Sequence, residues 1–348
     1  MEPFDVKKGP VAARSQLDLR SLVSRRNIAA AGLFLGAVVV LATTPRLLGH
    51  QVGDAVKGVE DARPIWLWAA GFSFLASLLA TSFAWRATLA LCGGELSRSD
   101  AAARYGVGSL VNGLSPARIG EAVRLALFAY ALDGEDRGWR MGSAFGVITA
   151  LRGLVFALVV IAAAAVGALP LWPVLLLAGL AIAAAGIAFA VRERAPRTHV
   201  AHALDAFRAL GRSPVKAAAI AGRLGLSTGV RFAGAAAIAA ALGVHAPFTA
   251  ALIIVPTLDL AGLIPLSGNV GITSGAVAIA LQQHGVALPQ ALATGLAFHA
   301  VETGAGITFG AAGALLLVGR RRLLVLAAAG ATACLAAAFC ATVLVPLA

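Results

Sequence analysis

The chain has 348 residues, of which 59% are hydrophobic and only 13% are charged, and its mean hydropathy is +0.87. A soluble globular protein carries about 25% charged residues, so this composition excludes that class and indicates an integral membrane protein. The formal net charge of +12 does not indicate nucleic-acid binding, because the basic residues fall in short loops between apolar runs, as the positive-inside rule predicts. The three cysteines form no recognisable metal or disulfide pattern.

Apolar runs and loop charges predict a multi-pass protein of the plasma membrane with a cytoplasmic N-terminus. Residues 1–26 are expected to be a basic cytoplasmic tail, and residues 27–345 a single polytopic domain. About seven spans are predicted, at residues 27–44, 65–91, 142–169, 174–191, 217–244, 290–318 and 323–344. Segment 199–210 has helical periodicity and is expected to lie on the cytoplasmic membrane surface.

The stretch Tyr105–Leu132 is apolar but is interrupted at residues 112–116. Its first arm, Tyr105–Asn112, is far shorter than the roughly 20 residues of a spanning helix, so we predict a re-entrant hairpin. The hairpin would enter from the cytoplasmic side, after a short loop that contains Arg98 and Arg104.

The second arm of this hairpin carries charge inside an apolar context. Ser115 and Pro116 suit the N-cap and first position of its helix, whose free amides would point into the protein. Arg118, Glu121 and Arg124 are spaced at i, i+3 and i+6 and therefore lie along one flank. This pattern predicts a site for an anion within the membrane. The alternative is an interfacial helix whose arginines reach the headgroups.

A second apolar stretch, Pro247–Gln283, is broken at residues 264–271. The orientation of the flanking spans places both of its ends outside, so we predict a second hairpin from the opposite face. Four small or polar residues precede a helix expected to begin near Ile272 and could let a ligand approach its N-terminus, namely Ser267, Gly268, Asn269 and Gly271. Simple packing of small residues is the alternative.

The order of these elements predicts an all-α membrane fold with an inverted repeat. The two halves are expected at about 65–191 and 217–345, and the broken helices of such folds mark the transport site. Ionisable residues in other apolar segments support a polar interior: Arg152, Arg231, Asp259, His299 and Glu302. A lone charge such as Arg231 costs at least about 2.5–3.5 kcal/mol at mid-span, so it needs a partner or a water-filled cavity. His299 and Glu302 could pair with Arg231 or Arg152.

At these motifs the chain resembles the lysylphosphatidylglycerol synthase transmembrane family, a flippase-like family that includes the flippase domain of the multiple peptide resistance factor. The resemblance covers about residues 27–345. Residues 112–124, NGLSPARIGEAVR, follow the family pattern N-x-x-x-P-x-R-x-G-E-x-x-R. Residues 265–274, PLSGNVGITS, keep part of P-x-P-G-G-x-G-x-x-E, and the family's later Arg is His299 here. The family's soluble synthase domain does not follow, so we expect no lipid-synthase activity.

The resemblance implies a lipid translocase that moves an anionic or polyprenyl-phosphate-linked lipid between leaflets. Arg118 and Arg124 would hold a phosphate, and Glu121 would orient them or meet an amino headgroup. The full set expected to bind substrate is Asn112, Ser115, Arg118, Glu121, Arg124, Arg152, Arg231, Ser267, Gly268, Asn269, Gly271, His299 and Glu302. If transport is driven, the candidates for proton coupling are Asp259, His299 and Glu302.

We expect a membrane lipid as substrate, with no catalytic residues, cofactor, metal ion or nucleic acid. A homo-oligomer and a separate lipid-modifying enzyme are left open as partners. One alternative function is a polyprenyl-phosphate glycosyltransferase, which the lack of a D-x-D metal motif disfavours. The other is a small-solute secondary transporter, which an inverted repeat would serve equally well.

Overall fold

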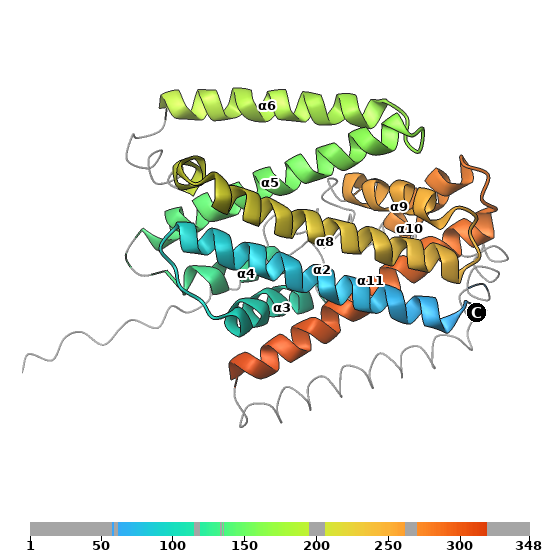
Figure 1. The fold of residues 1–348 in the computed structure, drawn as a ribbon, viewed down its shortest axis with the longest axis horizontal. Coiled ribbons are helices and arrows are strands. Elements are labelled where there is room, and N and C mark those ends of the chain that lie inside the picture. Colours follow the sequence, from blue (N-terminus) through green and yellow to red (C-terminus); the bar gives the residue numbers. More distant parts are fainter. Residues whose placement is uncertain are drawn as a thin grey trace, which may run out of the picture. The chain divides into compact units, whose positions relative to one another are not determined.

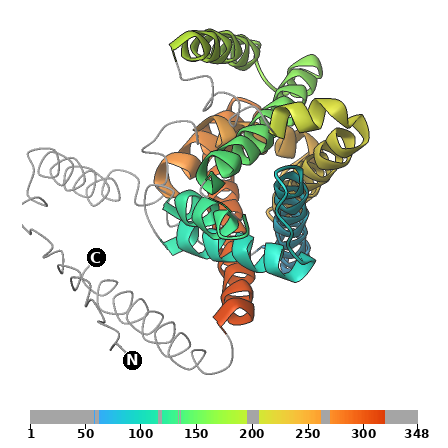
Figure 2. The same cartoon turned by 90° about the vertical axis from the view of Figure 1, so that its left-hand side faces the viewer.

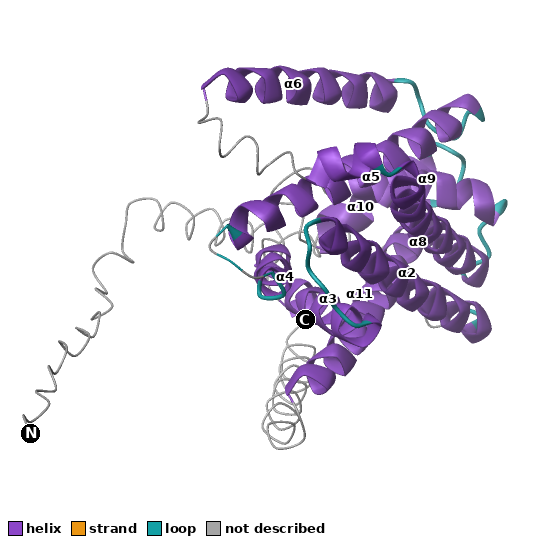
Figure 3. Ribbon diagram, turned by 60° about the vertical axis from the view of Figure 1, so that its left-hand side comes forward, coloured by secondary structure: helices purple, strands orange, loops and turns teal. Residues whose placement is uncertain are grey.

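The computed structural model describes residues 62–114, 119–132, 136–194, 206–261 and 270–318, together with Gly58 and Gly134. Throughout these ranges the only regular secondary structure is helix (Figure 3), which confirms the predicted all-α class. The main helices, all within the unit Gly53–Ala348, are α2 (Pro64–Leu91), α3 (Arg98–Leu114), α4 (Ile119–Ala129), α5 (Arg137–Ala165), α6 (Trp172–Arg194), α8 (Pro214–Ala241), α9 (Pro247–Ala261), α10 (Val270–Gln282) and α11 (Leu288–Val318).

Four of the described helices, α2, α5, α8 and α11, are long and apolar enough to cross a membrane. They correspond to the predicted spans at 65–91, 142–169, 217–244 and 290–318. The predicted span at 174–191 is α6, whose described apolar part, Trp172–Ile187, is shorter. The predicted spans at 27–44 and 323–344 lie outside the described residues.

Large apolar side chains cover the outer surfaces of these helices. Helix α6 packs chiefly on α5 (Figure 2, top), and side chains around its circumference, such as Leu175 and Ile182, are exposed. Trp66 and Trp68 are exposed in the first turns of α2, where aromatic residues commonly meet a membrane–water interface. Exposed apolar surface of this extent indicates contact with lipid.

The first predicted hairpin is present as the helix pair α3–α4, but its first arm is longer than expected. Helix α3 has 17 residues and begins at Arg98, so the prediction that Arg98 and Arg104 occupy a loop is wrong. Ser97 explains the earlier start, because its Oγ accepts a hydrogen bond from the Asp100 amide at 3.0 Å. Arg104 donates from Nη1 to the Leu127 carbonyl near the end of α4, which links the two arms of the hairpin. Both arms remain shorter than a normal span.

The second predicted hairpin is the pair α9–α10, with arms of 15 and 13 residues that pack on each other. Helix α10 begins at Val270, two residues before the expected start at Ile272. Pro256 lies inside α9, where it lacks the amide hydrogen needed for a helical hydrogen bond.

Helices α2 and α8 are near copies of one another in opposite orientation (Figure 1). Each has 28 residues, begins with Pro and ends at a C-cap with φ close to −93°. Gly93 and Gly243 follow with φ of 76° and 69°, a left-handed conformation that favours glycine. The helices pack antiparallel, since the Arg63 amide before α2 donates to the carbonyl of Ala241 at the end of α8 at 3.1 Å.

Residues 150 apart therefore occupy equivalent positions in α2 and α8, and the other helices pack in matching pairs. Helix α3 packs on α2 as α9 packs on α8, α4 packs on α5 as α10 packs on α11, and α3 packs on α11 as α9 packs on α5. Helices α5 and α11 also run in opposite directions (Figure 1). These correspondences agree with the predicted inverted repeat.

Small residues bring several backbones into contact. A Cβ on Gly106 of α3 would lie 2.8 Å from the Phe309 carbonyl oxygen of α11, so the glycine permits this close crossing. By contrast, a Cβ on Gly225 or Gly229 of α8 would meet nothing within 4 Å in the described chain.

Of the predicted surface helix 199–210, residues 206–210 are helical, and the Ala206 amide donates to Ser143 Oγ of α5 at 2.9 Å.

Candidate functional site

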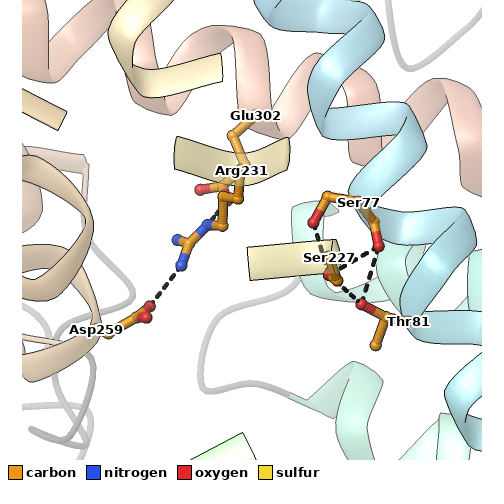
Figure 4. Close-up of polar contacts among 6 residues, drawn as sticks. All are labelled: Ser77, Thr81, Ser227, Arg231, Asp259 and Glu302. Atoms are coloured by element: carbon orange, nitrogen blue, oxygen red, sulfur yellow. Dashed lines mark hydrogen bonds and ion pairs between the residues drawn. The ribbon is translucent and has the colours of Figure 1, made fainter. Parts of the chain in front are cut away.

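An ion triad joins three helices at the middle of the apolar fold. The Arg231 guanidinium of α8 donates from Nε to Glu302 Oε1 of α11 at 2.7 Å and from Nη1 to Asp259 Oδ1 of α9 at 2.6 Å. The two carboxylates approach the guanidinium from different sides (Figure 4). Phe298 of α11 adds a cation–π contact, with the guanidinium carbon 5.7 Å from the ring centre. The structure thus supplies the internal partners that a mid-span arginine requires.

The charges of this triad do not balance. One arginine faces two carboxylates, so the group has a formal charge of −1 when all three are ionised. The arginine side chain is 17% exposed, whereas the side chains of Asp259 and Glu302 are 33% and 35% exposed. The two carboxylate side chains are therefore more accessible than that of the arginine, which is largely covered.

A cluster of three hydroxyls lies one helical turn from Arg231 (Figure 4). Ser227 Oγ of α8 lies 2.8 Å from Ser77 Oγ and 2.6 Å from Thr81 Oγ1, both on α2. Ser227 Oγ also lies 3.0 Å from the Ser77 carbonyl oxygen, to which Thr81 Oγ1 donates at 2.9 Å. All three side chains are buried, so the cluster fastens α2 to α8 at their crossing.

Arg124 forms a second charged centre, inside the α3–α4 hairpin. Its Nη1 donates to Glu121 Oε1 at 3.1 Å, and its Nη2 makes a long bond of 3.4 Å to Ser109 Oγ. The guanidinium carbon lies 3.9 Å from the centre of the Tyr105 ring and 6.0 Å from that of Trp85. The Arg124 side chain is only 5% exposed. These contacts hold α4 against α3 and α2.

Two buried polar atoms of this hairpin, Arg124 Nε and Asn112 Oδ1, have no hydrogen-bond partner among the described residues. They flank the closest approach of the two helices, where a Cβ on Gly120 would overlap the Gly108 carbonyl and the Asn112 side chain. Asn112 and Arg124 therefore lie on either side of the same helix crossing, and each keeps a polar atom that no described residue bonds.

The structure does not show the other predicted site residues in such hydrogen bonds or ion pairs within the described chain. Arg152 is exposed on α5, and His299 is half-buried on α11, without a hydrogen bond or ion pair to another described residue. Gly271 lies in the first turn of α10. The remaining predicted site residues lie outside the described ranges, namely Ser115, Arg118, Ser267, Gly268 and Asn269.

Sequence reasoning missed the hydroxyl cluster and the aromatic support of Arg124. Serine and threonine are common in membrane helices, so no local signal distinguishes Ser77, Thr81 and Ser227. The 150-residue offset between Ser77 and Ser227 is a signal that comparison of the two halves could have found.

An apolar groove of about 410 Å³ lies between α2 and α11. Its lining includes Trp68 and Phe72 of α2 and Val301 of α11, the residue that precedes Glu302. Among the side chains that the structure places, no three His, Cys, Asp or Glu residues gather to hold a metal ion.

The fold and these sites define a class: an all-helical membrane protein in which broken-helix pairs and long apolar helices enclose ionised residues. The chain belongs to the family described as the lysylphosphatidylglycerol synthase TM region, whose model matches residues 28–310. This assignment confirms the resemblance expected from the two motifs, and the family is a membrane domain associated with flippase-like function on lipids. No curated protein and no solved structure matches the chain.

Proposed function

We propose that the protein is a lipid translocase of the plasma membrane that moves a phosphate-bearing lipid between leaflets without converting it chemically. The observation that carries the proposal is the Arg231–Asp259–Glu302 triad, because it maintains a partly accessible polar site among apolar helices. Intramembrane ionisable residues in such positions normally mark a transport pathway. Family membership supports a lipid as the cargo.

In this proposal the two helix pairs are re-entrant hairpins and the N-terminus is cytoplasmic. The α3–α4 hairpin receives the phosphate through Arg118, and the buried Arg124–Glu121 pair holds the hairpin in shape. The headgroup passes the polar interior while the tails stay in apolar surroundings. The groove between α2 and α11 offers apolar surface, and one of its lining residues, Val301, directly precedes Glu302 in the sequence.

Leaflet exchange of fluorescent lipids in proteoliposomes tests this function. The wild type is compared with Arg118→Ala, using anionic, aminoacylated and polyprenyl-phosphate lipids in parallel. Arg98→Ala is the matched control, because Arg98 is an exposed arginine at the start of the same hairpin. We expect headgroup-selective exchange that Arg118→Ala removes and Arg98→Ala keeps. Absence of exchange for every lipid, with folded protein, would favour a glycosyltransferase instead.

A further inference from the structure

The excess negative charge of the ion triad points to a cation that the described chain does not supply. Arg231 is the eighteenth of 28 residues of α8, and it lies one turn from the Ser77–Ser227 contact between equivalent positions. In an inverted repeat such a contact lies on the pseudo-twofold axis, near the membrane midplane. An uncompensated charge at this depth is unfavourable by several kcal/mol, so a carboxylate there tends to be neutralised.

We propose that the triad is a proton-binding site and that Asp259 is the group that takes the proton. A hydronium ion gives its proton to the second carboxylate oxygen of Asp259, Oδ2, so that one O–H bond of hydronium breaks, the O–H bond of a neutral carboxyl group forms and a water molecule is left. The triad then carries no net charge, since Arg231 still faces ionised Glu302. A proton is the cation that fits because the guanidinium already occupies the space between the carboxylates (Figure 4).

Helix geometry distinguishes Asp259 from Glu302. Asp259 lies in the last turn of α9, where the partial negative charge of the helix end opposes a second negative charge. Pro256, three residues earlier, removes a backbone hydrogen bond from the same part of the helix. Glu302 instead occupies the middle of the 31-residue helix α11.

Among the described residues, few other ionisable groups lie on the helices near α9. On the described parts of the helices packed near α9, the charged or titratable residues are Lys216, Arg223 and Arg231 of α8, Arg137, Arg140 and Arg152 of α5, and His299 and Glu302 of α11, with none on α10. Arg231 and Glu302 are the ones bonded within the triad. The charge of Asp259 in the second hairpin therefore determines the strength of the ion pair between α9 and α8.

Proton binding would change how the hairpin is held. When Asp259 is ionised, its bond to Arg231 joins two opposite charges, whereas after protonation only the guanidinium is charged. Neutralisation weakens this tie between α9 and α8, while the Arg231–Glu302 tie between α8 and α11 remains. Where the protein translocates lipid as proposed above, this device would couple the movement to a proton gradient.

Difference infrared spectroscopy measures the proton directly, independently of transport. Spectra of the protein in phosphatidylglycerol nanodiscs are recorded over one series of pH values, identically for the wild type and each variant. We expect the C=O stretching band of one protonated carboxyl group, which shifts on labelling with [4-¹³C]aspartate and is absent in Asp259→Asn. Glu302→Gln, the matched control, removes the excess charge but keeps Asp259, so its band should be weaker than that of the wild type at the same pH.

A band that survives Asp259→Asn, or a band that is equally strong in the wild type and in Glu302→Gln, would overturn the proposal. So would a band that disappears when phosphatidylethanolamine is added, because an amine headgroup would then be the cation that neutralises the triad.

Proteoliposomes with a pH gradient separate this inference from the proposed function. The gradient should change wild-type lipid exchange several-fold and leave Asp259→Asn exchange unchanged. Exchange that ignores the gradient in both proteins would refute coupling while lipid translocation stands. The expected infrared band without any lipid exchange would refute translocation while the proton site stands.

Discussion

Ser77 and Ser227 form a hydrogen bond between the midpoints of two antiparallel helices, and each is the fourteenth residue of a helix of 28. Equivalent residues of two repeats touch one another only on the axis that relates the repeats. The contact of 2.8 Å between their Oγ atoms therefore locates the pseudo-twofold axis of the fold.

A covalent link on this axis should not block the proposed transport. When two inverted halves exchange conformations, residues on the axis keep their separation, whereas residues elsewhere move relative to one another. We expect Ser77→Cys/Ser227→Cys, made in a background without the three native cysteines, to retain lipid exchange after oxidation. Leaflet exchange is measured before and after reduction of the same sample. Loss of exchange on oxidation and recovery on reduction would contradict the position of the axis.

The hydroxyl cluster should contribute measurably to stability. Ser227→Ala leaves the Ser77 and Thr81 hydroxyls without their shared partner between the helices. We expect a loss of about 1–2 kcal/mol, detected as a lower midpoint of thermal unfolding by tryptophan fluorescence. Ser73→Ala is the matched control, because Ser73 bonds only to the Ala69 carbonyl of its own helix, and its midpoint should stay close to wild type.

Removal of Arg231 should destabilise the protein more than removal of the whole triad. Arg231→Met leaves two carboxylates without their cation, and breaking a fully buried pair costs about 3–5 kcal/mol. The loss here should be smaller, since about a third of each carboxylate side chain is exposed. We expect Arg231→Met/Asp259→Asn/Glu302→Gln to recover most of the unfolding midpoint lost in the single variant. A triple variant as unstable as Arg231→Met would show that charge is not the cause.

The α3–α4 crossing should not tolerate a side chain at Gly120. A Cβ there would overlap the Gly108 carbonyl, so Gly120→Ala must separate the arms and should lose about 1–3 kcal/mol. Gly142→Ala is the control, because a Cβ at this exposed position of α5 would meet nothing within 4 Å in the described chain. Thermal unfolding should show a lower midpoint for Gly120→Ala and an equal or slightly higher one for Gly142→Ala. Equal midpoints for both variants would argue against the close crossing.

Helix boundaries were predictable wherever an apolar run is bounded by clear start and stop residues. Helix α2 begins at Pro64 and ends before Gly93, one residue from the predicted start and at the predicted end. The prediction failed at α3, because Arg98 and Arg104 looked like loop residues in the sequence. Within α3, Arg104 donates a hydrogen bond to a carbonyl of α4, a contact that only the tertiary fold provides.

The sequence predicted that Arg231 needs a counter-charge, but it did not predict every residue that provides one. Arg231 lies in the middle of an apolar run and so requires a counter-charge, and Glu302 was one of the candidates for that role. The sequence did not indicate that Asp259 would meet the same guanidinium, because this depends on how α9 packs against α8. Arg124 was predicted to bind phosphate, yet Glu121, Ser109 and Tyr105 occupy most of its guanidinium.

The Ser77–Ser227 contact also restricts which side chains can stand at the centre of the fold. A residue on a twofold axis meets its own equivalent, so it must be complementary to itself. A hydroxyl satisfies this condition because it both donates and accepts a hydrogen bond, whereas a lysine or an aspartate would meet its own charge. Four residues further along, the halves differ: Thr81 stands in one and Arg231 in the other. The identical pair joins the two halves in the same way, and the unlike pair one turn away gives a charge to one half only.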